Sequence, residues 1–262
     1  ANTEQTTRRQ AVGQITHMLA QELALPVAPE VTRFVEQMLG DVRPLGVLFY
    51  GSGLRAGIDE DTLLDFYIIV SQQSDWPRSA LACMANAVLP PNVEYQELRV
   101  AGRAMRAKIA ILTLAQLHEL TGFSTLNTTV WARFSQPVRL VWSNNAQAAQ
   151  AITHCIVRAN VTAAKWAALL GPLKAPYRAF WDALYASTYK AELRVENGQR
   201  SSSLVDANLE RYEHSLLPCW QAAGIPFEAE GGEVLPLLTA EQKNKAQRQW
   251  RLRARLGRPV NI

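Results

Sequence analysis

One stretch of the sequence, residues 47–70, constrains the fold and the chemistry of this chain more than any other. An apolar run at 47–50 ends in a glycine-serine-glycine turn at 51–53. A second apolar run, at 66–70, begins directly after Asp65. Short apolar runs punctuated by glycine predict two strands joined by a tight turn and a loop. This arrangement places a serine hydroxyl and several backbone N–H groups beside a carboxylate.

These groups match the needs of nucleotidyl transfer. Successive N–H groups in a glycine turn form a concavity for phosphate oxygens, and glycine lets the backbone approach closely with a positive φ. Magnesium binds proteins through one or two carboxylates together with substrate phosphates. We therefore expect Gly51, Ser52 and Gly53 to bind a nucleoside triphosphate and Asp65 to hold Mg²⁺ at the edge of a cleft. An ordinary hairpin turn is the alternative interpretation of the same residues.

Composition limits the class of protein. The 262 residues are 48% hydrophobic and 19% charged, which is typical of a folded globular chain. A net charge of +4 favours anionic partners such as phosphates, nucleic acid or acidic lipid. Cys83, Cys155 and Cys219 form no CxxC pair, so we expect free thiols in a reducing cytosol. The histidines show no metal-ligand spacing.

The sequence also bears on location. No apolar stretch reaches the ~20 residues that cross a bilayer. Residues 1–10 are polar and lack the apolar core of a signal peptide. We therefore expect a cytoplasmic protein, either fully soluble or peripheral on the inner face of a membrane.

The pattern along the chain predicts four regions. Residues 1–10 are expected to be disordered, 11–145 to form a nucleotidyltransferase-like domain and 146–238 to form a helical domain. Residues 239–262 are strongly basic and are expected to form a helical tail. The expected fold class is therefore α/β of the α+β type, with a mixed-sheet nucleotidyltransferase-type domain followed by a helical C-terminal domain.

Apolar periodicity predicts the elements of these regions. Helices are expected at 11–24, 29–40, 76–89, 146–170, 175–195 and 203–222. Strands are expected at 45–50, 66–70, 93–100 and 105–112, with a further β-branched run at 138–142. The first half therefore mixes helices and strands, whereas the second half is mainly helical.

The order of strand, Gly-Ser, loop and Asp-bearing strand resembles the polymerase-β-type nucleotidyltransferase superfamily. That superfamily carries a second acid two residues after the first, whereas Phe66 and Tyr67 follow Asp65 here. The lone Asp before Phe, together with the motif YGSG, resembles one branch of the superfamily. This branch is the mitochondrial translocator-maintenance type of phosphatidate cytidylyltransferase, or CDP-diacylglycerol synthase.

Downstream segments extend this resemblance over about residues 45–205. Residues 105–111, which include Lys108, resemble the lysine-bearing strand of the family. Residues 131–138 are similar to its AGR-L-x-KPV segment, and residues 189–195 to its Y-x-GDFRM segment. The chain departs from the family at three positions, with Pro77 in place of His, Gln136 in place of Lys and Glu192 in place of Asp.

The resemblance implies a role for each candidate residue. Asp65 and Glu192 would hold Mg²⁺, and Lys108 would act with them in catalysis. The nucleotide would be bound by the turn at 51–53 and by Arg133, Arg194 and Arg200, since arginine forks suit phosphate geometry. The activity implied is transfer of CMP from CTP to phosphatidate, or to a related lipid phosphate, giving CDP-diacylglycerol and pyrophosphate.

The basic C-terminal segment suggests how such an enzyme would reach a lipid. Lysines and arginines surround Trp250, Leu252 and Leu256 in this segment. A basic helix with a tryptophan can lie weakly on an anionic membrane surface. A solvated terminal helix or a nucleic-acid contact is the alternative, and of these partners we expect anionic lipid and no nucleic acid.

Two other functions remain open on the sequence alone. One is a nucleotidyltransferase that modifies a small soluble molecule or a protein hydroxyl. The other is a degenerate domain that binds a nucleotide or a partner without catalysis, because the second acid and the histidine of the family are absent.

Overall fold

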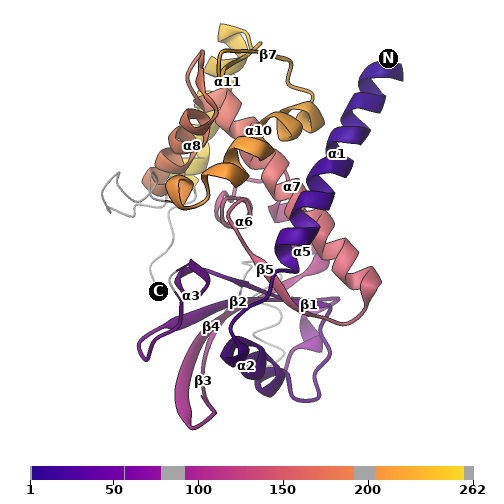
Figure 1. Cartoon of the computed structure of the whole chain (residues 1–262), viewed down its shortest axis with the longest axis vertical. Coiled ribbons are helices and arrows are strands. Elements are labelled where there is room, and N and C mark those ends of the chain that lie inside the picture. The colour runs from indigo at the N-terminus through magenta and orange to yellow at the C-terminus, as the bar shows by residue number, and fades with distance from the viewer. Residues whose placement is uncertain (1, 56, 78–91, 192–203, 257–262) are drawn as a thin grey trace. The chain divides into compact units, whose positions relative to one another are not determined.

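The computed structural model describes residues 2–55, 57–77, 92–191 and 204–256 of the chain (Figure 1). It is a mixed α/β structure with 56% helix and 21% strand. A mixed five-stranded sheet is combined with helices, which confirms the α+β class expected from the sequence.

The chain divides into two compact units, and each is assembled from separate segments. Unit 1 contains residues 1–17, 120–136 and 156–262, and unit 2 contains residues 18–119 and 137–155. The sequence pattern predicts contiguous domains that meet at 145, whereas segments of the two units alternate along the chain. Such alternation depends on long-range contacts, which local periodicity does not encode.

Unit 2 contains the five-stranded sheet, in the order β3-β4-β2-β1-β5. β1 (Gly46–Tyr50) runs antiparallel to both β2 (Leu63–Val70) and β5 (Arg139–Ser143). β4 (Arg103–Thr113) runs parallel to β2 and antiparallel to the edge strand β3 (Asn92–Val100). The strands expected from the apolar runs are therefore present, and β2 begins earlier than the run at 66–70.

Helix α2 (Pro29–Leu39) covers one face of this sheet. Its proline occupies the first turn, where the missing N–H costs nothing, and the helix ends at Gly40. Phe34 stacks on Phe66 of β2 with ring centroids 5.8 Å apart. Because strand side chains alternate between faces, Asp65 lies on the face opposite α2.

The other elements of unit 2 are short. They are the end of the first helix (residues 18–23), α3 (Ser52–Arg55), the 3₁₀ helix η1 (Gln73–Asp75), α5 (Leu114–Leu120, which ends at the boundary with unit 1) and the first part of α7 (Ala146–Leu170). Trp76 is buried after η1, and its indole N–H donates to Glu94 of β3 at 3.1 Å. Most of the helix expected at 76–89 lies outside the described residues.

Unit 1 is mainly helical and also contains a three-stranded sheet in the order β6-β8-β7. Its described helices are the first part of α1 (Asn2–Leu23), α6 (Thr129–Phe134), the later part of α7, α8 (Tyr177–Ala191), α10 (Leu209–Ala223) and α11 (Ala240–Leu256). Its strands are β6 (Ala175–Pro176), β7 (Phe227–Glu230) and β8 (Glu233–Pro236). The sequence pattern predicts no strand after residue 142, although the Gly231-Gly232 pair between β7 and β8, with positive φ at both residues, is typical of a two-residue hairpin turn.

Buried tryptophans organise the core of unit 1. The indole N–H of Trp181 donates to the carbonyl of Tyr212 at 2.9 Å. That of Trp220 donates to the carbonyl of Ala164 at 2.7 Å. These bonds join α8 to α10 and α10 to α7, so the aromatic side chains provide apolar burial without leaving the two indole donors unpaired.

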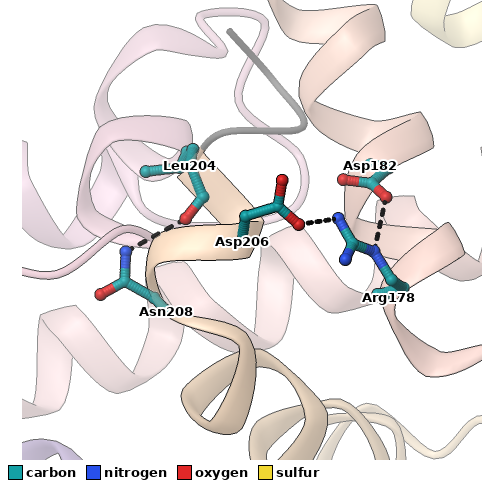
Figure 2. Close-up of polar contacts among 5 residues, drawn as sticks. All are labelled: Arg178, Asp182, Leu204, Asp206 and Asn208. Atoms are coloured by element: carbon teal, nitrogen blue, oxygen red, sulfur yellow. Dashed lines mark hydrogen bonds and ion pairs between the residues drawn. The ribbon is translucent and has the colours of Figure 1, made fainter. Parts of the chain in front are cut away.

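Arg178 of α8 forms one ion pair within its helix and one with a residue just before α10 (Figure 2). The Arg178 guanidinium contacts Asp182 at 3.2 Å and Asp206 at 2.6 Å. The hydrogen bonds that Arg178 donates to Asp206 and Asp182 raise the pKa of Arg178. The Asn208 amide donates to the carbonyl of Leu204 at 3.1 Å. All three charged side chains are partly exposed, so the pairs contribute modestly to stability.

Residues 2–10 are helical, which corrects the disorder expected for 1–10. They belong to α1 (Asn2–Leu23), where Arg8 pairs with Glu4 at 3.0 Å in an i,i+4 arrangement. The Arg8 guanidinium also lies against Gly224 at the end of α10. Apolar periodicity begins only at Ala11, so the pattern carried no signal for the preceding polar turns.

The basic C-terminal segment packs into unit 1 and is not a separate tail. The ring of Trp250 is buried against Trp131 and Trp166, with centroids 6.0 and 5.1 Å away. Arg253 is also buried, and its Nε donates to the carbonyl of Thr125 at 3.1 Å. Trp250 therefore cannot be the membrane contact that the sequence suggests for residues 239–262.

The described cysteines, Cys155 and Cys219, are buried free thiols, as expected. Burial raises the pKa of Cys219 to about 12, so this thiol stays protonated at neutral pH. Cys83 lies outside the described residues. Within the described part of the chain, no helix has an apolar stretch long enough to cross a membrane.

Replacement of Trp250 by alanine should lower the free energy of unfolding by about 3–5 kcal/mol, because it leaves a cavity in the core of unit 1. Leu252→Ala is the matched control on the same helix, since Leu252 is 48% exposed, and it should cost less than about 0.5 kcal/mol. Urea denaturation followed by circular dichroism measures both. Equal losses would contradict the packing of α11 into unit 1.

Candidate nucleotide-binding site

The glycine turn begins where β1 ends. Gly51 has a φ of +87°, in the left-handed region that glycine adopts without strain. Its carbonyl accepts hydrogen bonds from the N–H groups of Leu54 and Arg55 at 3.1 and 3.2 Å, which forms the single helical turn α3. Ser52, the first residue of this turn, is exposed. The turn therefore presents its serine to solvent at the end of a buried strand.

The backbone of Gly51 lies directly against the carboxylate of Asp65. A Cβ atom built on Gly51 would be 2.5 Å from Oδ2 of Asp65, closer than real contacts allow. The register explains this approach, because Asp65 of β2 is paired with Tyr50, the residue before the turn. Gly53 is buried, and a Cβ there would meet Phe49 and Leu64 side chains at 3.3 Å. Glycine at 51 is therefore what brings the turn and the carboxylate together.

Lys108 joins this pair from the next strand. Asp65 and Lys108 are register partners in the parallel pairing of β2 with β4. Adjacent strands are about 4.8 Å apart, so the two side chains rise from neighbouring backbone positions. Ala107 and Ile109 are buried in the α2-facing core, which turns Lys108 to the face that also carries Asp65. The site in unit 2 thus combines a turn, a carboxylate and an ammonium group.

The loop that returns the chain to β2 is fixed by Asp59. Its Oδ1 accepts hydrogen bonds from the Thr62 hydroxyl and the Asp61 N–H, both at 2.9 Å. The hydrogen bond from Thr62 lowers the pKa of Asp59, followed by that from Asp61. The Asp59 carboxylate therefore holds the loop in place ahead of the strand that carries Asp65.

Two tyrosines flank Asp65 on the same face of the sheet and were not identified from the sequence as a pair. The rings of Tyr50 and Tyr67 are 5.3 Å apart, and both are buried. Residues two apart on a strand lie on the same face, so the spacing of Asp65 and Tyr67 in the sequence could have placed Tyr67 beside Asp65.

The structure brings together five of the predicted site residues, Gly51, Ser52, Gly53, Asp65 and Lys108, in unit 2. Arg133 belongs to unit 1, where it is half-buried near the end of α6. Glu192, Arg194 and Arg200 lie outside the described residues. Their roles, including the second metal ligand, stay predictions.

The donor set fits a magnesium ion that arrives with a triphosphate. Asp65 supplies one carboxylate against the turn, and Mg²⁺ typically uses one or two carboxylates and completes its shell with phosphates and water. Among the described residues there is no group of three or more His, Cys, Asp or Glu side chains placed to hold a metal ion. A closed all-protein cage is therefore not what the described part of the site offers.

Comparison with known proteins does not assign the chain to a family: no protein-family model matches it, and no curated protein matches its sequence.

The contact between Gly51 and Asp65 can be tested against Gly57, which also has a positive φ, of +82°, but has nothing within 4 Å of a built Cβ. Alanine at either position should cost about 1–3 kcal/mol of stability through backbone strain, and at position 51 the clash with Asp65 adds to this cost. Only Gly51→Ala displaces the Asp65 carboxylate, so it alone should weaken binding of CTP with Mg²⁺ by about tenfold or more. Urea denaturation and isothermal titration calorimetry measure the two effects. Equal losses of binding would contradict a role for the contact.

Proposed function

We propose that this chain is a nucleotidyltransferase whose nucleoside triphosphate lies on the face of the sheet that carries Asp65. The observation that supports this best is the contact of the Gly51 backbone with the Asp65 carboxylate, beside Lys108. A glycine turn offers N–H donors to phosphate oxygens, and a neighbouring carboxylate offers a ligand for the accompanying metal. An ordinary hairpin turn does not require a carboxylate packed on the turn backbone.

Each residue has a defined task in this proposal. The exposed Ser52 hydroxyl and the turn amides bind the β- and γ-phosphates. Asp65 would hold Mg²⁺, with Glu192 as the second carboxylate that the family resemblance implies. When bound, the ion neutralises the triphosphate and polarises the phosphorus under attack. Lys108 adds a positive charge next to Asp65, where negative charge develops on the transferred group.

The chemistry then needs little beyond positioning and charge. An anionic oxygen of the acceptor phosphate attacks the α-phosphorus, and a new O–P bond forms. The bond from the α-phosphorus to the bridging oxygen of the β-phosphate breaks, and pyrophosphate leaves with that electron pair. A phosphate acceptor is already ionised at pH 7, so no general base is required. A hydroxyl acceptor would need a base.

We propose CTP as the nucleotide and phosphatidate, or a related lipid phosphate, as the acceptor. This choice rests on the resemblance of residues 45–205 to phosphatidate cytidylyltransferases. The same resemblance assigns Arg133, Arg194 and Arg200 to the phosphates of nucleotide or acceptor. Arginine suits that role because its planar fork donates two parallel hydrogen bonds to a phosphate group.

A lipid acceptor requires contact with a membrane, and the exposed side of α11 supplies the charge for it. Glu241 is the only acid of this helix, and Leu252 and Leu256 are 48% and 60% exposed. Four exposed cations accompany them, Lys245, Arg248, Arg251 and Arg255. Cations near an anionic leaflet are attracted to it, and the attraction is screened by salt. The attachment is therefore weak and peripheral.

Asp65→Asn should lower the rate of nucleotidyl transfer by about 10²–10³-fold, because it removes the charge that holds the metal while preserving shape. Asp59→Asn is the matched control: asparagine keeps the accepting oxygen that closes the loop, so its rate should stay within about twofold of wild type. Mass spectrometry of products measures the rate, with phosphatidate in mixed micelles, Mg²⁺ and each of the four nucleoside triphosphates.

CDP-diacylglycerol formed only from CTP, and lost in Asp65→Asn, is the expected result. If a nucleoside triphosphate binds but no lipid product forms, the lipid acceptor is contradicted. The remaining function is then nucleotidyl transfer to a small soluble molecule or a protein. Absence of both binding and product would contradict the transferase itself and leave a degenerate domain. Nucleotide titration separates these two failures.

The exposed cations of α11 should carry membrane binding. Each contributes about 1 kcal/mol near an anionic surface, so replacing three should weaken binding by about 100-fold. The variant is Arg248→Gln with Arg251→Gln and Arg255→Gln, which spares the buried Trp250 and Arg253. A triple Arg→Gln control at the exposed Arg9, Arg33 and Arg99 has the same net charge. Co-sedimentation with phosphatidate-containing vesicles measures both, and equal losses would contradict a specific role for α11.

A further inference from the structure

The register of β2 with its two neighbours defines two levels on the face of the sheet that carries Asp65. Asp65 is paired with Tyr50 of β1 on one side and with Lys108 of β4 on the other. Because β1 runs antiparallel to β2, the turn that follows Tyr50 lies at the level of Leu63 and Leu64. The contact of a Gly53 Cβ position with Leu64 agrees with this placement. The turn is thus one level beyond the Asp65 carboxylate.

Arg106 occupies that same level on the opposite side of β2. It is the register partner of Leu63, two residues before Lys108 on β4. Met105 and Ala107 are buried in the α2-facing core, so Arg106 projects from the face that carries Lys108 and Asp65. Two residues of strand rise separate the backbone positions of Arg106 and Lys108 by about 6.6 Å. Two strand spacings separate the backbone of Arg106 from that of the turn by about 10 Å. A polyphosphate at the turn lies within reach of its long side chain.

The guanidinium of Arg106 is also available. The side chain is exposed and, within the described part of the chain, it makes no hydrogen bond or ion pair, even though Glu97 is its register partner on β3. Its neighbour on the same face, Arg99, instead donates to the carbonyl of Gly102 at 3.2 Å. Of these two arginines, Arg106 therefore keeps all of its guanidinium N–H donors free of hydrogen bonds to the described residues.

From this placement we infer that Arg106 binds the terminal phosphates of the nucleoside triphosphate, opposite the 51–53 turn. The inference rests on the proposed function and adds a residue to it. The triphosphate would be held at two levels, with the α-phosphate beside Asp65 and Lys108 and the β- and γ-phosphates between the turn and Arg106. Arginine forms bidentate charge-assisted hydrogen bonds with phosphate, which suits a chain of phosphates that must be aligned for departure of pyrophosphate.

The test separates terminal phosphates from the rest of the nucleotide. The affinities of CTP, CMP and inorganic tripolyphosphate, each with Mg²⁺, are measured by isothermal titration calorimetry on wild type, Arg106→Gln, Arg106→Lys and Arg99→Gln. Arg106→Gln should lower the affinity for CTP and for tripolyphosphate by about tenfold or more, and change the affinity for CMP by less than about twofold. Arg106→Lys should recover part of the loss, since lysine keeps the charge but not the fork. Arg99→Gln should bind like wild type.

The remaining outcomes overturn the inference in distinguishable ways. If Arg106→Gln and Arg99→Gln weaken CTP equally, the effect is one of net charge and Arg106 has no specific contact. If CTP and CMP affinities fall together, Arg106 acts either on the part of the nucleotide that both ligands share or on the fold. A lowered melting temperature of the variant would identify an effect on the fold. If wild type binds neither CTP nor tripolyphosphate, the proposed function fails and this inference fails with it.

Discussion

The site in unit 2 depends on one close approach, that of the Gly51 backbone to the Asp65 carboxylate. Two constraints produce it: a positive φ at Gly51, and the register that pairs Tyr50 with Asp65. Any side chain at position 51 would occupy the space of the carboxylate oxygen. The turn, the carboxylate and Lys108 therefore form one arrangement, set by backbone geometry before any ligand is present. Pre-organisation of this kind reduces the reorganisation that accompanies charge development.

Much of the fold was predictable because apolar periodicity is a local property. The runs around Phe49, Phe66 and Ile109 specify strands whose alternate residues reach the α2-facing core, and the structure confirms them. The same alternation put Asp65 on the other face. The turn chemistry of glycine, which depends only on φ, was equally visible in the sequence.

The features that were missed depend on contacts between distant segments. Nothing near Trp250 distinguishes an indole that packs on Trp131 and Trp166 from one that lies on a membrane. The polar first turns of α1 carry no apolar signal, although Arg8 reaches Gly224 far along the chain. The division of the chain into two units with alternating segments was missed for the same reason, because it depends on which distant segments pack together. For the site, the register that aligns Lys108 with Asp65 required the parallel pairing of β2 and β4 to be known.

The discontinuous make-up of unit 2 has a consequence for the order in which the protein is made. The strands that carry Asp65 and Lys108 are complete at Thr113, whereas β5 begins only at Arg139, after a segment that belongs to unit 1. During synthesis from the N-terminus, β1 would therefore be an open sheet edge until β5 leaves the ribosome. Unpaired edges invite pairing with other chains. Nascent chains halted between these two points should be the most prone to aggregate, although they already contain the turn, the carboxylate and the lysine.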